Sequence, residues 1–370
     1  MFHALPDPLR TGLSFAVVLG VLVFVHELGH YLAARWRGVH VEVFSIGFGR
    51  AIATWTDRVG TVWKLAWLPL GGYVKLHGQE RPEDVPPEDR ARWMAGRTFH
   101  EKDVLSRAIV VAAGPVANFL LAMVLFSMLF AISGKPVAVP VVGEILEHSA
   151  AEKAGLVAGD RIVAIDGQPI RTFEDIQRIV TAHPSQRLTL GVVRDNAQRS
   201  VDVTTDARET SNGPVGVLGI RGGNTEFERL GPLQAVWAGI VQTWDVTDQT
   251  VAGVWQMLSG RRGTEDLGGP LRIAQLSGQV AQLGFASLVS FIAVLSVNLG
   301  LINLFPIPVL DGGHLLFYLA EAVRGRPIPP RAQEYGFRAG LALLVGLFVF
   351  ATWNDLSHLG IVRWFAGLIG

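Results

Sequence analysis

Four long apolar segments constrain the fold of this chain more than any other feature. They cover about residues 13–34, 108–133, 285–322 and 337–353, and each is near or above the ~20 residues that cross a bilayer as a helix. Apolar residues make up 49% of the chain and charged residues only 17%, which is typical of membrane proteins. The sequence therefore predicts a polytopic α-helical membrane protein with four transmembrane helices.

The first apolar segment carries the motif His26-Glu27-Leu28-Gly29-His30. On a helix, His26 and His30 lie one turn apart on the same face, where both can bind one metal ion while Glu27 stays free of it. This H-E-x-x-H arrangement is typical of zinc peptidases, in which the glutamate is the general base for attack on an amide. Ionisable residues inside a membrane segment are costly and so indicate function; hydrogen-bonded histidines in a soluble helix are the alternative.

Two histidines leave a catalytic zinc one protein ligand short. The chain has no cysteine, so the missing ligand must be His, Asp or Glu. Asp311 lies inside the third apolar segment, where a carboxylate without a partner would be costly. We therefore predict Asp311 as the third ligand, with a carboxylate hydrogen-bonded to its neighbours as the alternative. His314 is expected to have a supporting or structural role.

Pro306 and Pro308 interrupt the third apolar segment just before Asp311. Prolines break helices, and a broken helix at membrane depth usually lines a site. Asn298 and Asn303 precede the break and are candidates to bind the substrate backbone or the oxyanion of the tetrahedral intermediate. Hydrogen bonds that stabilise the broken helix are the alternative role for both asparagines.

Residues 39–78 are rich in β-branched and aromatic residues, with glycines at turn positions. They predict either a cytoplasmic β-sheet or a sheet that dips into the membrane beside the metal. In the second case the edge with Gly71, Gly72 and Tyr73 would pair with an extended substrate.

Basic residues near the ends of the apolar segments predict the orientation in the membrane. They follow the first segment, precede the second, and lie between the third and fourth: Arg35, Arg37, Arg97, Lys102, Arg107, Arg324, Arg326, Arg331 and Arg338. By the positive-inside rule these regions face the cytoplasm, with residues 135–284 outside. No basic stretch has the character of a nucleic-acid site, so no nucleic-acid partner is expected.

The stretch from Gly155 to Gly167, Gly-Leu-Val-Ala-Gly-Asp-Arg-Ile-Val-Ala-Ile-Asp-Gly, resembles PDZ domains in their circularly permuted bacterial form. The resemblance implies an inserted periplasmic α+β PDZ domain with a groove for a peptide C-terminus. The expected groove lies between residues 141–145 and 173–181, and a domain that only fills space over the membrane is the alternative. From Leu233 onward the spacing predicts an amphipathic helix, on the membrane face or packed as a soluble helix.

The expected division of the chain follows these features in order. It comprises a first transmembrane helix (1–36), a cytoplasmic-side re-entrant β-region (37–104) and a second transmembrane helix (105–134). These are followed by the PDZ domain (138–208), a periplasmic segment (209–284), a broken third transmembrane segment (285–323) and a fourth transmembrane helix (337–357).

Five motifs occur in the order seen in site-2 proteases: the H-E-x-x-H motif, Gly71–Lys75, Gly114–Asn118, the PDZ segment and Asn303–Gly312. The chain is therefore similar to this M50 zinc metalloprotease family, in its bacterial RseP-type branch, the regulators of sigma-E protease. The chain departs from the enterobacterial pattern in having one PDZ segment instead of two.

The resemblance implies one Zn²⁺ per chain, with His26, His30 and Asp311 as ligands and Glu27 as catalytic base. It also ties Asn303, Pro306 and Pro308 to substrate handling. It implies intramembrane cleavage of single-span proteins, such as an anti-sigma factor or remnant signal peptides, in the bacterial inner membrane. A metal transporter and an inactive PDZ-bearing scaffold are the alternatives, but neither explains the complete set of ligands and base.

Overall fold

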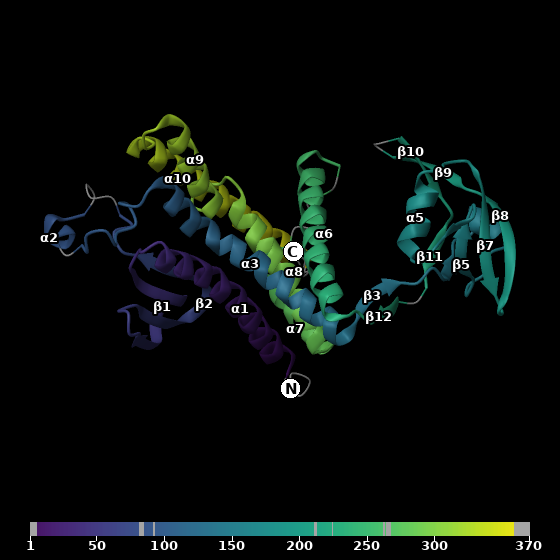
Figure 1. The fold of residues 1–370 in the computed structure, drawn as a ribbon, viewed down its shortest axis with the longest axis horizontal. Helices are drawn as coiled ribbons and strands as arrows, with labels where there is room; N and C mark the ends of the chain where they lie inside the picture. The colour runs from purple at the N-terminus through teal and green to yellow at the C-terminus, as the bar shows by residue number, and fades with distance from the viewer. Residues whose placement is uncertain are drawn as a thin grey trace, which may run out of the picture. The chain divides into compact units, whose positions relative to one another are not determined.

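A computed structural model describes residues 6–80, 85–91, 93–210, 213–223, 225–261, 263 and 268–358. The chain divides into two compact units (Figure 1). Unit 1 comprises Met1–Leu129 and Leu233–Gly370, and unit 2 is the inserted stretch Phe130–Pro232. The insertion explains why the metal-binding motif and Asp311 lie far apart in the sequence yet belong to one unit.

Unit 1 contains four described helices that are long and apolar enough to cross a membrane. They are α1 (Asp7–Trp36), α3 (Val104–Ser133), α8 (Phe285–Leu304) and α10 (Pro330–His358). Buried apolar side chains of α1 and α8 form one cluster with partly buried side chains of α3. α10 begins seven residues before the expected position 337, because its first turns are polar and a hydropathy criterion leaves them out.

The membrane unit also contains one β-sheet, formed by β1 (Val41–Thr56) and β2 (Val62–Leu76) beside α1 (Figure 1). Residues 62–65 pair with residues 53–56 on one side and with residues 43–46 on the other. Residues 72–76 pair with the outer side of residues 41–46. Residues 43–46 and 62–65 therefore each have a paired segment on both sides, and residues 72–76 form an edge of the sheet.

The third apolar segment is broken in the structure. α8 ends at Leu304, and α9 (Asp311–Arg324) begins after a six-residue link, 305–310, that holds Pro306 and Pro308. Because neither proline has an N–H group, the link cannot continue the hydrogen-bond pattern of α8. The break places Asp311 at the first position of α9.

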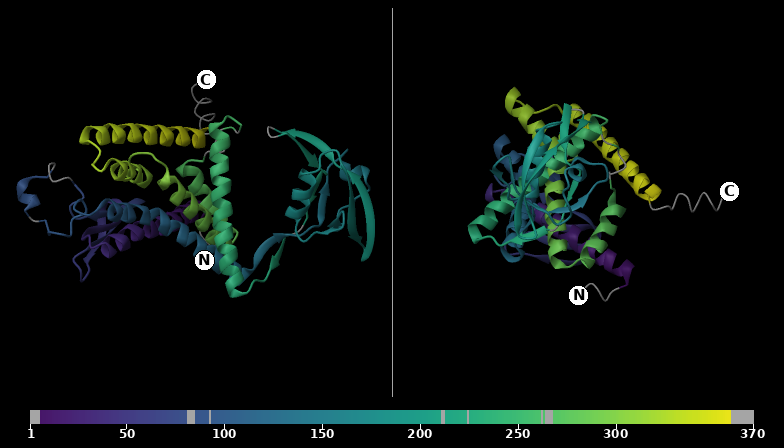
Figure 2. Two further views of the ribbon diagram at one scale, coloured as in Figure 1. Left: turned by 45° about the horizontal axis from the view of Figure 1, so that its top comes forward. Right: turned by 90° about the vertical axis from the view of Figure 1, so that its right-hand side faces the viewer.

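Three further helices occur in the described part of unit 1: α2 (Pro87–Arg90), α6 (Pro232–Leu258) and α7 (Pro270–Gln282). α6 is the expected amphipathic helix. Its Ala235, Gly239 and Thr243 are buried, while Trp237 and Trp244 are exposed. It runs across the direction of α10 (Figure 2, left), and Asp355 of α10 accepts hydrogen bonds from the backbone at the start of α7.

Unit 2 has a four-stranded sheet in the order β6-β5-β7-β8, packed against one helix, α5 (Phe173–Thr181). Alternate residues of β7, Leu188, Leu190 and Val192, are buried against Ile176 of α5. The strands and the remaining short helix of the unit are β3 (Lys135–Ala138), β4 (Val142–Ile145), α4 (Ala150–Lys153), β5 (Arg161–Ile165), β6 (Gln168–Pro169), β7 (Arg187–Arg194), β8 (Ala197–Thr204), β9 (Asp206–Thr210), β10 (Gly213–Val217), β11 (Ile220–Gly222) and β12 (Thr225–Glu228).

Two expectations for this unit were wrong. The domain does not end at residue 208, because β12 pairs with β3 and β11 pairs with β4. Residues 213–228 therefore belong to the insertion, although their many glycines hide the strand pattern. Nor is β4 the open strand of a groove against α5: its edge is taken by β11, and a Cβ on Gly222 of β11 would lie 3.5 Å from the Phe173 ring of α5.

Candidate metal centre and active site

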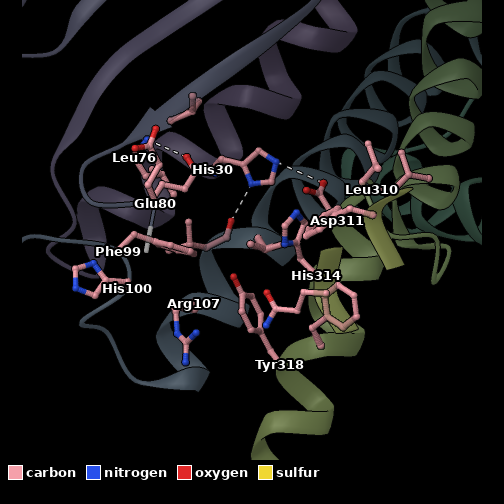
Figure 3. Close-up of a pocket in the computed structure, with 18 of the residues that line it drawn as sticks. His30, Leu76, Glu80, Phe99, His100, Arg107, Leu310, Asp311, His314 and Tyr318 are labelled. Atoms are coloured by element: carbon pink, nitrogen blue, oxygen red, sulfur yellow. Dashed lines mark hydrogen bonds and ion pairs between the residues drawn. The ribbon is translucent and has the colours of Figure 1, made fainter. Parts of the chain in front are cut away.

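His26, His30 and Asp311 meet in unit 1. The Nε2 atoms of the two histidines are 3.2 Å apart, and Asp311 Oδ2 lies 3.3 Å from His26 Nε2 and 3.5 Å from His30 Nε2. One ligand atom from each residue lies within 4.8 Å of the other two, and no other such group of three occurs in the described part of the chain. Figure 3 shows the His30 ring turned toward the Asp311 carboxylate.

The spacing of these three atoms fits a zinc ion. Donor atoms about 2.0–2.1 Å from a tetrahedral zinc are about 3.3–3.4 Å from one another, and the three observed distances, 3.2, 3.3 and 3.5 Å, bracket this separation. Asp311 Oδ2 is buried and has no hydrogen-bond partner among the described residues. A buried carboxylate oxygen beside two imidazole nitrogens is stabilised by a cation, so the donor set suits Zn²⁺.

The packing of α3 against α1 orients the second histidine. His30 Nδ1 donates a hydrogen bond to the backbone oxygen of Val110, 2.9 Å away, which leaves Nε2 free to face the cluster (Figure 3). Gly114, one turn farther along α3, makes room for the ring: a Cβ at this position would lie 2.2 Å from His30 Nε2. Only glycine fits there.

Glu27 lies beside the edge of the sheet. A Cβ on Gly72 would lie 3.0 Å from Glu27 Cγ and 2.6 Å from the backbone oxygen of Ser45. Gly72 therefore lets the edge strand approach the carboxylate directly. Glu27, Gly72, Tyr73 and Val74 line a cavity of about 1430 Å³ that also includes the three metal-binding candidates.

The outer end of the edge strand is held by Glu42. Its carboxylate accepts hydrogen bonds from Lys75 Nζ at 2.8 Å and from His77 Nδ1 at 2.7 Å. Partial burial raises the pKa of Glu42, but the bonds from Lys75 and His77 outweigh it and bring the pKa below its ordinary value. Glu42 thus stays ionised and ties the end of the strand to the sheet.

Of the other substrate-binding candidates, one lines the cavity and the rest are not among its lining residues. Asn303 lines the cavity. Asn298 instead accepts a hydrogen bond from Thr250 Oγ1 of α6 at 3.0 Å, the helix-stabilising alternative. Gly71 lies against the Phe48 ring, and Pro306 and Pro308 form the link before α9.

His314 lines the cavity but is outside the group of three ligand atoms, and its ring lies 5.2 Å from the Phe337 ring.

Sequence reasoning missed two parts of the site that come from α3. Arg107 forms an ion pair with Glu321 of α9 at 2.7 Å, and its guanidinium lies 5.0 Å from the centre of the Tyr318 ring. Asn118, fully buried, lies 3.1 Å from His26 Nδ1. A signal existed for Asn118, because an amide inside an apolar membrane segment is costly.

The chain is similar to known metalloproteases over nearly its whole length. A family model described as Peptidase family M50 matches residues 14–347. A candidate zinc metalloprotease of Rhizobium meliloti is 46% identical over 364 residues, which cover 94% of this chain and 96% of the relative. The metalloprotease MmpA of Caulobacter vibrioides is 38% identical, covering 96% of this chain and 97% of its own.

The regulator of sigma-E protease RseP of Escherichia coli is 34% identical over 448 residues, covering 94% of this chain and 98% of its own. Among solved structures, the PDZ domain of the SdrC-like protein of Listeria monocytogenes aligns with 22% of this chain and 84% of its own, at 18% identity and a TM-score of 0.20.

Proposed function

The chain belongs to peptidase family M50, and on this premise we propose that it is an intramembrane endopeptidase that cleaves membrane-spanning segments of single-span proteins. It is a multi-pass membrane metalloprotease related to RseP. The observation that carries the finer proposal is the joint geometry of the ligand cluster, Glu27 and the edge strand around one cavity.

The chain's own residues define the catalytic steps. His26, His30 and Asp311 would hold one Zn²⁺, which when bound polarises the scissile carbonyl and acidifies a water molecule. Glu27 accepts the proton from the water that attacks the carbonyl carbon, and then gives this proton to the leaving amide nitrogen. Asn303, which lines the cavity, would donate a hydrogen bond to the substrate backbone or to the developing oxyanion.

The edge strand accounts for how a helix becomes a substrate. A membrane helix uses its own backbone hydrogen bonds, so its amides must be unwound before they can be attacked. Residues 72–76 present backbone groups beside Glu27, and an unwound segment can pair with them as an additional strand. This supports helix-destabilised segments as substrates, such as those of anti-sigma factors or remnant signal peptides.

The charge pattern supports an orientation in the bacterial inner membrane. The Arg107 end of α3 and the loop between α9 and α10 carry basic residues, and the positive-inside rule then supports a cavity that faces the cytoplasm and an insertion in the periplasm. The Arg107–Glu321 pair lines the same cavity, so this part of the cavity wall is polar. Water for hydrolysis would enter from this side.

The test is cleavage of a purified single-span substrate by the full chain in proteoliposomes. Glu27→Gln is expected to abolish cleavage while zinc content stays at one per chain, because the variant keeps all three ligands. The matched control is Glu80→Gln, an exposed glutamate at the rim of the same cavity, which should cleave normally. Cleavage by the Glu27→Gln variant would refute the proposal, and zinc flux into the vesicles would favour a transporter.

A further inference from the structure

The motif Gly114–Asn118 contains one side chain that the reaction does not use. Asn118 is fully buried in the middle of the apolar helix α3. A buried amide without hydrogen-bond partners is costly, and more so in a membrane segment. Its amide group lies against the outer nitrogen of His26, with Nδ2 at 3.1 Å from His26 Nδ1, while Oδ1 has no partner among the described residues.

The tautomer of His26 decides which atom of the Asn118 amide should face its Nδ1 atom. His26 Nε2 faces Asp311 Oδ2 at 3.3 Å and His30 Nε2 at 3.2 Å, so this nitrogen is the one that would bind a cation. A neutral imidazole that binds through Nε2 carries its proton on Nδ1, and its neighbour must then be an acceptor. Half a turn of the amide about its terminal bond brings Oδ1 to this place and gives the unpartnered oxygen a donor.

The other histidine is held in the same way. His30 Nδ1 donates to the backbone oxygen of Val110, also on α3, at 2.9 Å. One helix therefore contacts the outer nitrogens of both histidines, with a backbone oxygen for His30 and an amide side chain for His26. Such partners fix the tautomer and the ring plane of a metal-binding histidine.

We infer that Asn118 is a positioning residue: its amide oxygen accepts the Nδ1 proton of His26 and keeps Nε2 directed at the metal. The inference rests on the zinc site of the proposed function. The contact of Asn118 with α8 does not involve its side chain. The Asn118 backbone oxygen accepts a hydrogen bond from Ser296 Oγ at 2.8 Å, so this packing contact can be tested separately from the amide.

Two substitutions separate positioning from packing. Asn118→Asp keeps an acceptor beside Nδ1, and Asn118→Leu has a similar volume but removes it. Positioning predicts that the leucine variant loses about 10–100-fold in zinc affinity, while the aspartate variant binds zinc within about threefold of wild type. If Asn118 only packs, the aspartate variant should bind zinc more weakly than the leucine variant, because an uncompensated buried charge destabilises an apolar helix more than leucine does.

Zinc affinity is measured on the full chain in detergent by competition with a chromogenic chelator, and the zinc-dependent rise in thermal midpoint provides a second readout. Ser296→Ala is the matched control: it removes a buried hydrogen bond to the same residue and should leave zinc affinity unchanged. If the leucine variant does not accumulate, Asn118→Met takes its place.

Wild-type affinity in the leucine or methionine variant, or an aspartate variant as weak as leucine, overturns the inference alone. Absence of zinc binding by the wild-type chain overturns the inference and the proposed function together.

Discussion

The two halves of the metal cluster are built in different ways. His26 and His30 lie one turn apart on α1, so helix geometry places both rings on one face, and their Nε2 atoms lie 3.2 Å apart. Asp311 begins another helix after a proline-containing link, and its carboxylate reaches the histidines only because α9 is held beside α3. The histidine half is local and should fail only when its immediate surroundings change, whereas the aspartate half should respond to substitutions several turns away.

Among the substitutions that test this comparison, Gly114→Ala should have the largest effect, because it disturbs the histidine half directly. The new Cβ would lie 2.2 Å from His30 Nε2, so the ring must move away from the cluster. We expect loss of about 10²-fold or more in cleavage rate, the usual consequence of moving a catalytic group by about 1 Å, together with weaker zinc binding.

Gly346→Ala in α10 is the matched control, because a Cβ there has nothing within 4 Å. Equal rates for both alanine variants in the proteoliposome assay would contradict the tight packing of α3 against His30.

A medium effect is expected when the aspartate half is disturbed at a distance. Arg107→Met removes the ion pair with Glu321, both partners of which are less than one-fifth exposed. α9 then loses a contact that fixes the direction of Asp311, and we expect kcat to fall roughly tenfold, equivalent to about 1–2 kcal/mol. The measurement is kcat and KM of cleavage for Arg107→Met and for the doubly reversed variant R107E/E321R, which should recover part of the loss.

The exposed pair Arg338–Glu334 provides the control for this experiment. Exposed ion pairs contribute little, so Arg338→Met should leave kcat unchanged. An equal loss in both methionine variants, or no recovery on charge reversal, would show that α9 does not depend on this contact.

The smallest effect on catalysis is expected from substitutions in the inserted domain, which has its own hydrophobic core. Asp160 is fully buried and accepts hydrogen bonds from Arg194 at 2.6 and 2.7 Å. Burial raises the pKa of Asp160, but the bonds from Arg194 and from the Val157 backbone outweigh it, so the pKa is lowered.

A lowered pKa in the folded state stabilises the domain at pH values above the unfolded pKa of about 3.9, and this contribution is lost as pH falls through the folded value. Hydrogen exchange of amides in residues 130–232, corrected for intrinsic rates, should therefore show loss of protection below about pH 4. Asp160→Asn should lower protection at neutral pH and flatten its pH dependence. A variant with unchanged pH dependence would remove Asp160 as the cause.

Much of the site could be predicted from the sequence, because ionisable side chains in a membrane segment have a high desolvation cost and therefore indicate function. The histidines, Glu27 and Asp311 stand out against apolar neighbours, and two prolines mark the break before α9. Asn298 was a candidate to bind the substrate, with a structural hydrogen bond as the alternative, and the structure gives it a partner on α6. Cost in a membrane indicates that a polar residue has a partner, but does not say which one.

The inserted domain shows a different limit. Its glycine-rich last strands carry little alternation, so the boundary at residue 208 was too early and β4 was taken as an open edge. Strand pairing between residues 142–145 and 220–222 joins the two ends of the domain, and no periodicity within either strand predicts the other.

The sequence by itself determined the chemistry of this protein: the helical spacing of His26 and His30, the glutamate between them, the carboxylate after the break and the apolar lengths that enclose them. Only the tertiary structure decided how these groups are held, since α3 contacts His26, His30 and α9 through Asn118, Val110 and Arg107. The reason is physical. Helix periodicity is a property of neighbouring residues, whereas the direction of a side chain's lone pair depends on packing between helices that the sequence separates.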